Sequence, residues 1–211
     1  MDVPEALASA ATGMRAQSAK LDAIAENLAN AGTVGYRPRR AVLAGFGERL
    51  ESTIVASTSQ GGLRRTGVPT DLALVGPGAF AFAAASGVEY SRDGRLQVDP
   101  SGYLCDARGR RALGALGPAR FPRGAHVDSD GRIVRGGQVL DRLRVVDERH
   151  PLTRGAAQVR AGYLEDSGVD PIAEMTALVG AERAYEANQK SAQRADESLR
   201  RAVTDVPAVR P

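Results

Sequence analysis

The sequence is poor in the residues that build redox, metal and aromatic sites. Its 211 residues include one cysteine, two histidines and no tryptophan, and aromatic residues make up only 4%. A single cysteine excludes an intramolecular disulfide and a cysteine-based metal cluster. His126 and His150 are isolated from each other and from Cys105, so no metal site is predicted. Cys105 lies in a strand-like run, where we expect a buried structural thiol.

Long hydrophobic runs are also missing. No stretch approaches the roughly 20 apolar residues of a membrane-spanning helix. The first twenty residues carry the charged residues Asp2, Glu5, Arg15 and Lys20 and lack the apolar segment of a secretory signal. We therefore expect no membrane insertion and no cleaved signal peptide. These signals predict a cytosolic protein, unless an export system that needs no cleaved signal handles it.

Nothing in the sequence resembles a catalytic constellation. The carboxylates are scattered, and no serine or cysteine has the supporting histidine and acid that nucleophilic catalysis needs. Asp128, Asp130 and Gly131 suggest a calcium loop only faintly, because the twelve-residue ligand pattern and its closing glutamate are missing. A β-turn is the favoured interpretation. We therefore predict a protein that is not an enzyme, with no catalytic, cofactor-binding or metal-binding residues and no cofactor.

Positive charge comes almost entirely from arginine, since lysine occurs only at Lys20 and Lys190. Two clusters stand out, and their members are Arg37, Arg39 and Arg40 in the first and Arg108, Arg110 and Arg111 in the second. One hypothesis is a small arginine-rich module that binds an acidic polymer such as nucleic acid. The formal net charge of +3 and the scarcity of stacking aromatics oppose nucleic-acid binding. Solvated arginines, or arginines that bridge subunits, are favoured instead.

The most informative pattern is a seven-residue apolar repeat near each end of the chain. Such a repeat places a narrow apolar stripe on one face of a helix, which favours helix–helix pairing. We predict that these stripes form an assembly interface. Its residues are Leu7, Met14, Leu21, Ile24 and Leu28 near the start, and Leu178, Tyr185, Ala192 and Leu199 near the end.

The first helix is predicted over residues 4–30. The last helix begins at Asp170, a favoured N-cap, and Pro171, which suits the first helical position. This last helix continues to about Ala202. Between the helices, turn residues alternate with short strand-like runs. One hairpin is expected at residues 92–95, where Asp93-Gly94 can supply positive φ angles.

The predicted fold class is α+β. A small antiparallel β domain over residues 67–164 is flanked by long N- and C-terminal helices that pair as an α-helical coiled-coil or bundle domain. That terminal assembly domain comprises residues 1–30 with residues 165–204. Residues 31–66 are expected to form an extended connector.

Three ordered blocks of sequence resemble bacterial flagellar rod and hook proteins. The first contains Ser9-Ala-Ala-Thr-Gly13-Met14, Leu21-Asp22-Ala-Ile24-Ala25-Glu-Asn27-Leu28-Ala29-Asn30 and Thr33-Val-Gly35-Tyr36-Arg37. The second contains Thr70-Asp71-Leu72-Ala73-Leu74, Gly76-Pro-Gly78-Ala-Phe80 and Tyr90-Ser-Arg92-Asp-Gly94. The third contains Gly162-Tyr163-Leu164-Glu165, Ser167-Gly-Val169-Asp170-Pro171 and Arg183-Ala-Tyr185-Glu186-Ala187-Asn188. The second block is similar to the FlgF/FlgG-type rod subgroup.

This resemblance implies a structural axial subunit of the flagellar basal-body rod, which polymerises through its terminal helices and transmits torque between motor and hook. It also implies a periplasmic rod location reached through the flagellar type III export apparatus, without a cleaved signal. The implied partners are copies of itself, neighbouring rod proteins and the hook side of the axial structure. A divergent rod or hook paralogue with an accessory assembly role is the alternative within the family. We expect further helix-end and connector residues at Asn27, Asn30, Gly35, Tyr36, Asp170 and Pro171.

Overall fold

The computed structural model describes residues 3–46, 49–147 and 155–204. The chain divides into two compact units. Unit 1 comprises residues 1–29, 39–57 and 170–211, and unit 2 comprises residues 30–38 and 58–169. Each unit is therefore discontinuous in sequence, and the two ends of the chain both belong to unit 1.

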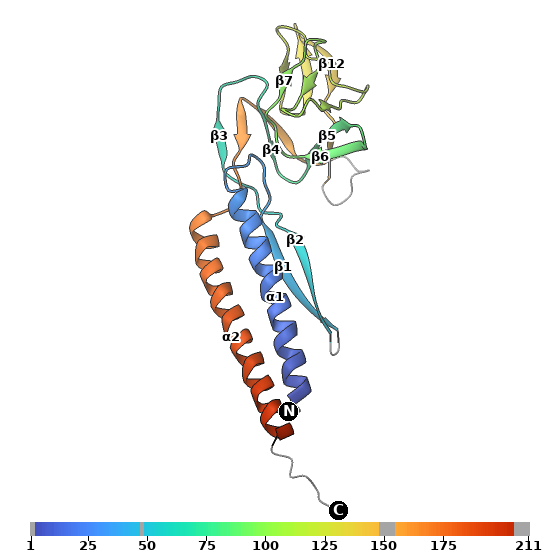
Figure 1. Ribbon diagram of the computed structural model, residues 1–211. Helices are drawn as coiled ribbons and strands as arrows, with labels where there is room; N and C mark the ends of the chain where they lie inside the picture. Colours follow the sequence, from blue (N-terminus) through green and yellow to red (C-terminus); the bar gives the residue numbers. More distant parts are fainter. Residues whose placement is uncertain (1–2, 47–48, 148–154, 205–211) are drawn as a thin grey trace, which may run out of the picture. The chain divides into compact units, whose positions relative to one another are not determined.

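Unit 1 is built on two helices, α1 (Val3–Ala29) and α2 (Pro171–Thr204). Both are rich in alanine, leucine, glutamate and glutamine, which favour helix. They lie side by side (Figure 1). The Asn27 side chain of α1 contacts Glu174 of α2, whereas Gly13 of α1 lies against Asn188. The two helices are therefore antiparallel. Neither is apolar enough over a sufficient length to cross a membrane, among the residues that the structure describes.

The third part of unit 1 is an antiparallel hairpin of β1 (Arg39–Phe46) and β2 (Arg49–Ala56). Its register pairs Arg39 with Ala56 and Phe46 with Arg49. Both strands contact α1, and Figure 1 shows α1 between α2 and the hairpin. The hairpin lies within residues 31–66, where the sequence suggested an extended connector.

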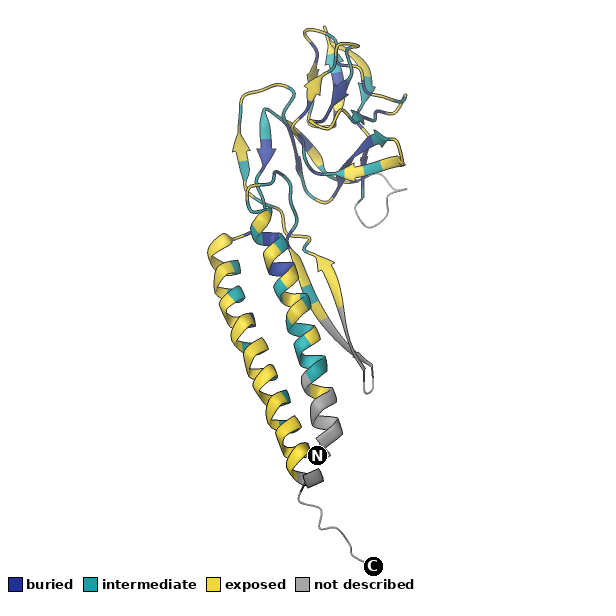
Figure 2. Cartoon of the chain, in the orientation of Figure 1, coloured by how far each residue is buried: buried dark blue, intermediate teal, exposed yellow. Residues whose placement is uncertain are grey.

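The prediction that the terminal helices pair as a coiled-coil or bundle domain is wrong, because unit 1 is two helices with a β-hairpin. A coiled coil buries large apolar side chains along a continuous stripe. In α1 the buried residues Ala23, Ile24 and Asn27 lie within the last two turns. In the described part of α2 only the small side chain of Ala181 is fully buried, and Tyr185 remains exposed. Figure 2 shows that most of α2 is exposed.

Unit 2 is an antiparallel β domain made of several small sheets. Its strands are β3 (Leu63–Arg65), β4 (Leu72–Val75), β5 (Ala79–Ala84), β6 (Gly87–Ser91), β7 (Gln97–Val98), β8 (Leu104–Cys105), β9 (Arg111–Ala112), β10 (His126–Val127), β11 (Arg132–Arg135), β12 (Gln138–Arg142), β13 (Val145–Val146), β14 (Gln158–Ala161) and β15 (Tyr163–Glu165). One sheet has the order β13-β5-β9-β8-β7, with β6 also paired to β5. A second has the order β10-β11-β12, and β14–β4 and β15–β3 form separate pairs.

The core of unit 2 gathers residues from most of these strands. Leu72 and Leu74 of β4 and Phe80 and Phe82 of β5 are almost completely buried. Burial alternates with exposure along some strands, for example in β11, where Ile133 is buried between an exposed and a partly exposed neighbour. This alternation is typical of antiparallel sheets with one face in the core. Cys105 is buried in β8, which confirms the predicted burial of its thiol. Burial raises the pKa of the Cys105 thiol and so disfavours its reactive thiolate.

Candidate functional site

One buried amide side chain connects all three parts of unit 1. The Asn27 Nδ2 group donates to the Arg39 carbonyl oxygen at 2.8 Å, and the Arg39 amide donates to Asn27 Oδ1 at 2.7 Å. Asn27 thus bonds to both the amide and the carbonyl of Arg39, the first residue of β1. The same Nδ2 group donates to Glu174 Oε1 of α2 at 3.2 Å. We refer to Asn27, Arg39 and Glu174 as the Asn27 junction.

Replacing Asn27 with alanine should destabilise unit 1. The change removes the side chain that bonds both the Arg39 amide and the Arg39 carbonyl in a part-buried site, and the net loss of a hydrogen bond costs about 0.5–1.5 kcal/mol. We expect the free energy of unfolding of α1 and α2, followed by circular dichroism at 222 nm in urea, to fall by that amount. Ser18→Ala is the matched control, because Ser18 is exposed on the same helix. An equal loss in the two variants would show that the junction contributes nothing.

The other predicted helix-end residues lie at the boundaries of their elements. Asp170 Oδ1 accepts from the Ile172 amide at 3.0 Å and from the Ala173 amide at 3.2 Å, and α2 begins at Pro171. Asn30 follows α1 immediately. Its side chain accepts from Thr33 Oγ1 at 3.1 Å, and its carbonyl accepts from Ser167 Oγ at 3.0 Å.

Gly35 and Tyr36 continue this segment in unit 2. Gly35 has a φ of 66°, and a Cβ there would lie 2.7 Å from the backbone carbonyl of Arg92. Its amide donates to the Glu165 carbonyl at 2.8 Å. The Tyr36 carbonyl accepts from the Gly168 amide at 3.0 Å. Residues 33–36 are therefore fixed to β15 and the residues that follow it.

Unit 2 also contains a buried ion pair between Arg92 and Glu165. Arg92 Nε donates to Glu165 Oε2 at 2.8 Å, and the NH2 group lies 2.6 Å from the same oxygen. The remaining guanidinium hydrogens donate to the carbonyls of Gly76, at 3.1 Å, Gly78, and Leu74, at 3.2 Å. Glu165 Oε1 accepts from the Gly61 amide at 3.3 Å and lies 3.9 Å from Arg37. Both residues lie in the family-like motifs of the sequence, but no sequence pattern predicts that they pair.

The arginine clusters are largely compensated by acids. Arg39 pairs with Glu26 at 2.9 Å, and Arg111 pairs with Asp99 at 2.9 Å. Arg110 lies 2.6 Å from Asp106 and also pairs with Glu89. A nucleic-acid interface needs arginines available for phosphate contacts. The arginine-rich binding module is therefore not favoured.

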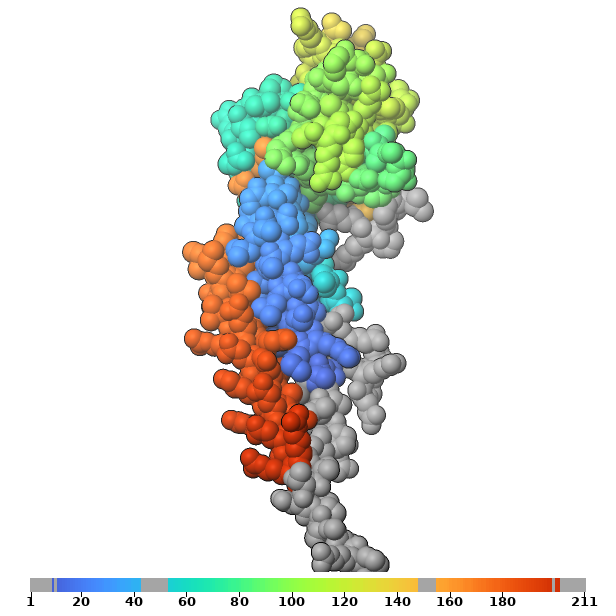
Figure 3. Space-filling model, in the orientation of Figure 1, coloured from blue at the N-terminus to red at the C-terminus, as the bar shows by residue number. Residues whose placement is uncertain are grey.

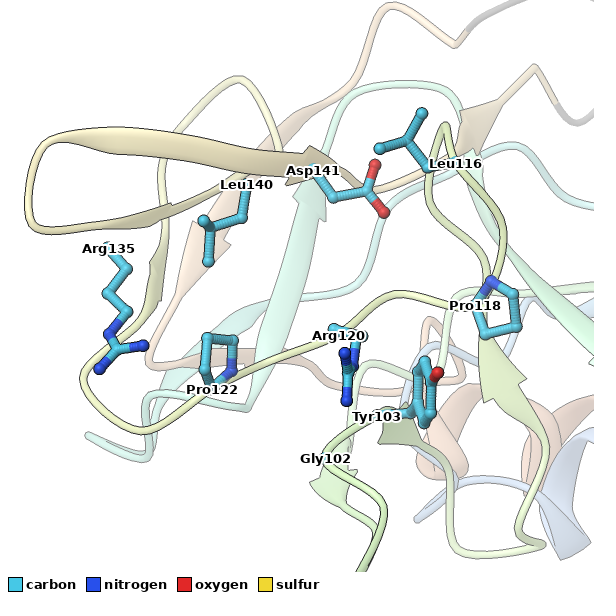
Figure 4. A pocket seen from close by; sticks show the side chains of 9 residues that line it. All are labelled: Gly102, Tyr103, Leu116, Pro118, Arg120, Pro122, Arg135, Leu140 and Asp141. Carbon is cyan, nitrogen blue, oxygen red and sulfur yellow. The ribbon is translucent and has the colours of Figure 1, made fainter.

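A depression of about 610 Å³ lies on unit 2 (Figure 4). Its lining residues are Gly102, Tyr103, Leu116, Pro118, Arg120, Pro122, Arg135, Leu140 and Asp141. The Arg120 guanidinium carbon lies 5.4 Å from the centre of the Tyr103 ring, within range of a cation–π contact. This lining offers apolar and cationic contacts but no nucleophile paired with a base. Among the described residues, no group of histidine, cysteine, aspartate and glutamate side chains could hold a metal ion.

The predicted assembly residues fall on both helices of unit 1. Ile24 is buried, and Met14, Leu21, Leu28, Leu178 and Ala192 are partly buried. Tyr185 is exposed. The side chains of Leu7 and Leu199 lie outside the described residues. The structure also exposes Ile172, Met175 and Val179 on α2, which the seven-residue pattern did not select.

Both helices of unit 1 lie in regions that match known families. Residues 7–37 match the family described as flagella basal body rod protein, and residues 160–205 match the C-terminal family of flagellar basal body rod FlgEFG proteins. The chain is 31% identical to the flagellar basal-body rod protein FlgG of Agrobacterium fabrum, over 91% of this chain and 95% of that protein. The chain belongs to the flagellar basal-body rod protein family.

Other rod proteins are similar over most of their length. Identity is 29% to FlgF of Mesorhizobium japonicum, over 86% of this chain and 89% of that protein. It is also 29% to FlgF of Escherichia coli K12, over 91% of this chain and 94% of that protein. The chain is thus a structural subunit of the flagellar basal-body rod and assembles with other basal-body components, as its resemblance to rod and hook proteins predicted.

Proposed function

We propose that this rod-family chain polymerises along the rod axis through α1 and α2, and that the packed helices transmit torque between motor and hook. The observation that carries this proposal is the antiparallel packing of α1 on α2, since the family segments at the two ends of the chain contribute to a single unit. A contact between two different surfaces, repeated by a screw operation, generates an open helical assembly.

The location and the partners follow from the same proposal. The subunit occupies the periplasmic rod, which it reaches through the flagellar type III export apparatus without a cleaved signal. Its neighbours are copies of itself, other rod proteins and the hook side of the axial structure. This role requires the subunit to bear mechanical load and requires no catalysis.

Mass spectrometry of purified hook–basal bodies from the source organism tests the role directly. We expect the chain at a stoichiometric level relative to the other rod proteins. Its absence from intact, functional basal bodies would overturn the proposal and favour a rod or hook paralogue with an accessory assembly role.

Leu21→Asp tests the helical interface. Leu21 is partly buried on α1, and a carboxylate placed among apolar side chains must be desolvated without a partner. We expect the variant chain to be missing from basal bodies and the cells to lose motility. Ser18→Asp introduces the same charge at an exposed position of α1 and should be incorporated normally. Normal incorporation of Leu21→Asp would contradict assembly through this face.

A further inference from the structure

Apolar side chains line the depression on unit 2 and remain open to solvent. Leu116, on the loop between β9 and β10, is 86% exposed, and Leu140, on β12, is 39% exposed. Val139 adjoins Leu140 and is 56% exposed. Figure 3 shows yellow-green and yellow atoms, the colours of residues around 115–140, at the surface of unit 2. Apolar side chains that gather at an exposed depression mark a place of contact with another molecule.

A β-bulge in β12 turns Leu140 towards the depression. The register pairs Val134 with Val139 and Ile133 with Asp141. Leu140 is thus an extra residue, which the register leaves without a partner on β11. A bulge interrupts the alternation of faces along a strand and re-aims side chains. Leu140 and Asp141, although neighbours in sequence, accordingly both line the depression (Figure 4).

Asp141 joins two sides of the depression. Its Oδ1 oxygen accepts from the Ala115 amide at 3.1 Å, and Ala115 precedes Leu116 on the loop. The Arg142 amide donates to the same oxygen at 2.7 Å. A Cβ on Gly114 would overlap Asp141 Oδ2, so glycine leaves room for the carboxylate in this position. The loop and β12 are therefore fixed to each other, and the depression is pre-formed, as ligand sites usually are.

The depression also carries positive charge that no acid of unit 2 neutralises. Arg120 and Arg135 line it, and both are exposed and form no ion pair in the described part of the chain. Arg110 and Arg111, by contrast, pair with acids. Asp141 is the only acid among the described lining residues, and two backbone amides already donate to it. The depression is therefore an apolar surface in a positive electrostatic potential.

These features fit an acidic peptide segment better than a free anion or a nucleic acid. A small anion would pair with a guanidinium group but would leave Leu116 and Leu140 in water. Nucleic-acid bases stack on open aromatic rings, whereas the guanidinium carbons of Arg111 and Arg120 lie 4.5 Å and 5.4 Å from the centre of the Tyr103 ring. A peptide offers a carboxylate and an apolar side chain close together, and a volume of about 610 Å³ admits several side chains.

We propose that this depression binds an acidic, apolar segment of a different basal-body protein. One aliphatic or aromatic side chain of the segment packs among Leu116, Pro118 and Leu140, and a neighbouring carboxylate pairs with Arg120 or Arg135. Charge complementarity makes the partner acidic. The proposal concerns a surface of unit 2, outside the terminal helices, and it rests on the proposed rod function for the source of the partner.

Photo-cross-linking in assembled basal bodies tests this contact. Cells produce the full-length chain with p-benzoylphenylalanine in place of Leu140, the purified particles are irradiated, and the cross-linked peptides are sequenced by mass spectrometry. We expect an adduct to a segment of another basal-body protein that carries aspartate or glutamate beside the cross-linked residue. The matched control carries the same group in place of Val88, which is 43% exposed on β6 and does not line the depression. The control should not give this adduct.

The outcomes separate this contact from the rod function. Equal adducts from the two positions, an adduct only to a second copy of this chain, or an adduct to a segment without acids would overturn the contact. The lack of an adduct in particles that contain the chain would also overturn it, and the rod function would stand. If the wild-type chain is missing from the particles, the rod function fails and the contact fails with it. Leu116 is the second position for the photoreactive group if the Leu140 variant is not incorporated.

A charge reversal tests the electrostatic part of the contact. In the chain labelled at position 140, Arg120→Glu should lower the adduct yield about tenfold, as expected when a close charge pair becomes repulsive. Lysine in place of the acid in the cross-linked segment should restore the yield. Arg160→Glu is the matched control, because Arg160 is exposed on β14 and its guanidinium carbon also lies near a tyrosine, 5.9 Å from the centre of the Tyr163 ring. Equal yields in the two variants would show that charge does not select the partner, and the proposal would fail.

Discussion

Arg92→Met is expected to lower the free energy of unfolding of unit 2 by about 3–5 kcal/mol, the usual loss when one partner of a buried ion pair is removed. The substitution leaves the Glu165 carboxylate buried without its main cation. It also removes the donor to the carbonyls of Leu74, Gly76 and Gly78. Differential scanning calorimetry of the full chain should show a melting temperature lower by about 10 °C or more for the β unit.

Two further variants show how much of this loss of stability comes from the burial of the ion pair. Arg95 lies three residues after Arg92 and forms an ion pair with Asp93. Arg95→Met removes this pair, but the pair is solvent-exposed and should contribute less than about 1 kcal/mol. The double variant Arg92→Met/Glu165→Leu removes both charges together. It should lose less than the sum of the single variants, because neither charge is left uncompensated. Equal losses in Arg92→Met and Arg95→Met would show that the buried pair contributes no more than a surface pair.

The ion pair matters for the proposed mechanical role because of the segments it fixes. Within unit 2, Glu165 accepts hydrogen bonds from Gly35 through its carbonyl and from Gly61 through its carboxylate. Residues 30–38, 58–62 and 163–169 are the segments by which the chain enters and leaves this unit. Fixing these segments to one another at a single buried residue suits a subunit that transmits torque.

Local sequence signals located the helices well. The predicted ranges, 4–30 and from Asp170-Pro171 to about Ala202, agree closely with α1 and α2. These signals are local, since alanine-rich composition and capping residues act within a few residues. The hairpin of β1 and β2 was not predicted, because Gly45 and Gly47 are residues that commonly interrupt strands. The pairing of the two strands becomes clear only when α1 covers one face of the hairpin.

The role of Arg92 and Glu165 could not be found from the sequence for a different reason. Charged residues are rarely buried, so nothing in the sequence pattern marks Arg92 and Glu165 as a buried pair. Arg92 and Glu165 are 73 positions apart in sequence, and their proximity depends on the complete sheet arrangement. Similarly, a seven-residue period cannot reveal that Ile172, Met175 and Val179 remain exposed once α1 has packed on the opposite face.

The prediction of a hairpin at residues 92–95 is wrong, because the flanking strands β6 and β7 pair with β5 and β8 and not with each other. The sequence predicted a positive φ angle in Asp93-Gly94, but Gly94 is not among the glycines with positive φ. What requires glycine there is a close backbone approach. A Cβ on Gly94 would overlap the Leu72 carbonyl oxygen and lie 2.7 Å from its carbonyl carbon. The Leu72 amide donates to the Gly94 carbonyl at 2.9 Å, so the two segments cannot separate without losing this bond.

Gly94→Ala should therefore destabilise unit 2 strongly although it adds a single methyl group. The overlapping atoms belong to the backbone of β4, so no rotamer change relieves the contact, and we expect a loss of about 3 kcal/mol or more, combining overpacking with the lost hydrogen bond. Gly62→Ala is the matched control, since Gly62 is exposed, has no positive φ and faces open space. It should change the free energy of unfolding by less than about 0.5 kcal/mol. If calorimetry gives the two variants the same melting temperature, then the approach of Gly94 to Leu72 is not what holds β4 against residues 92–95.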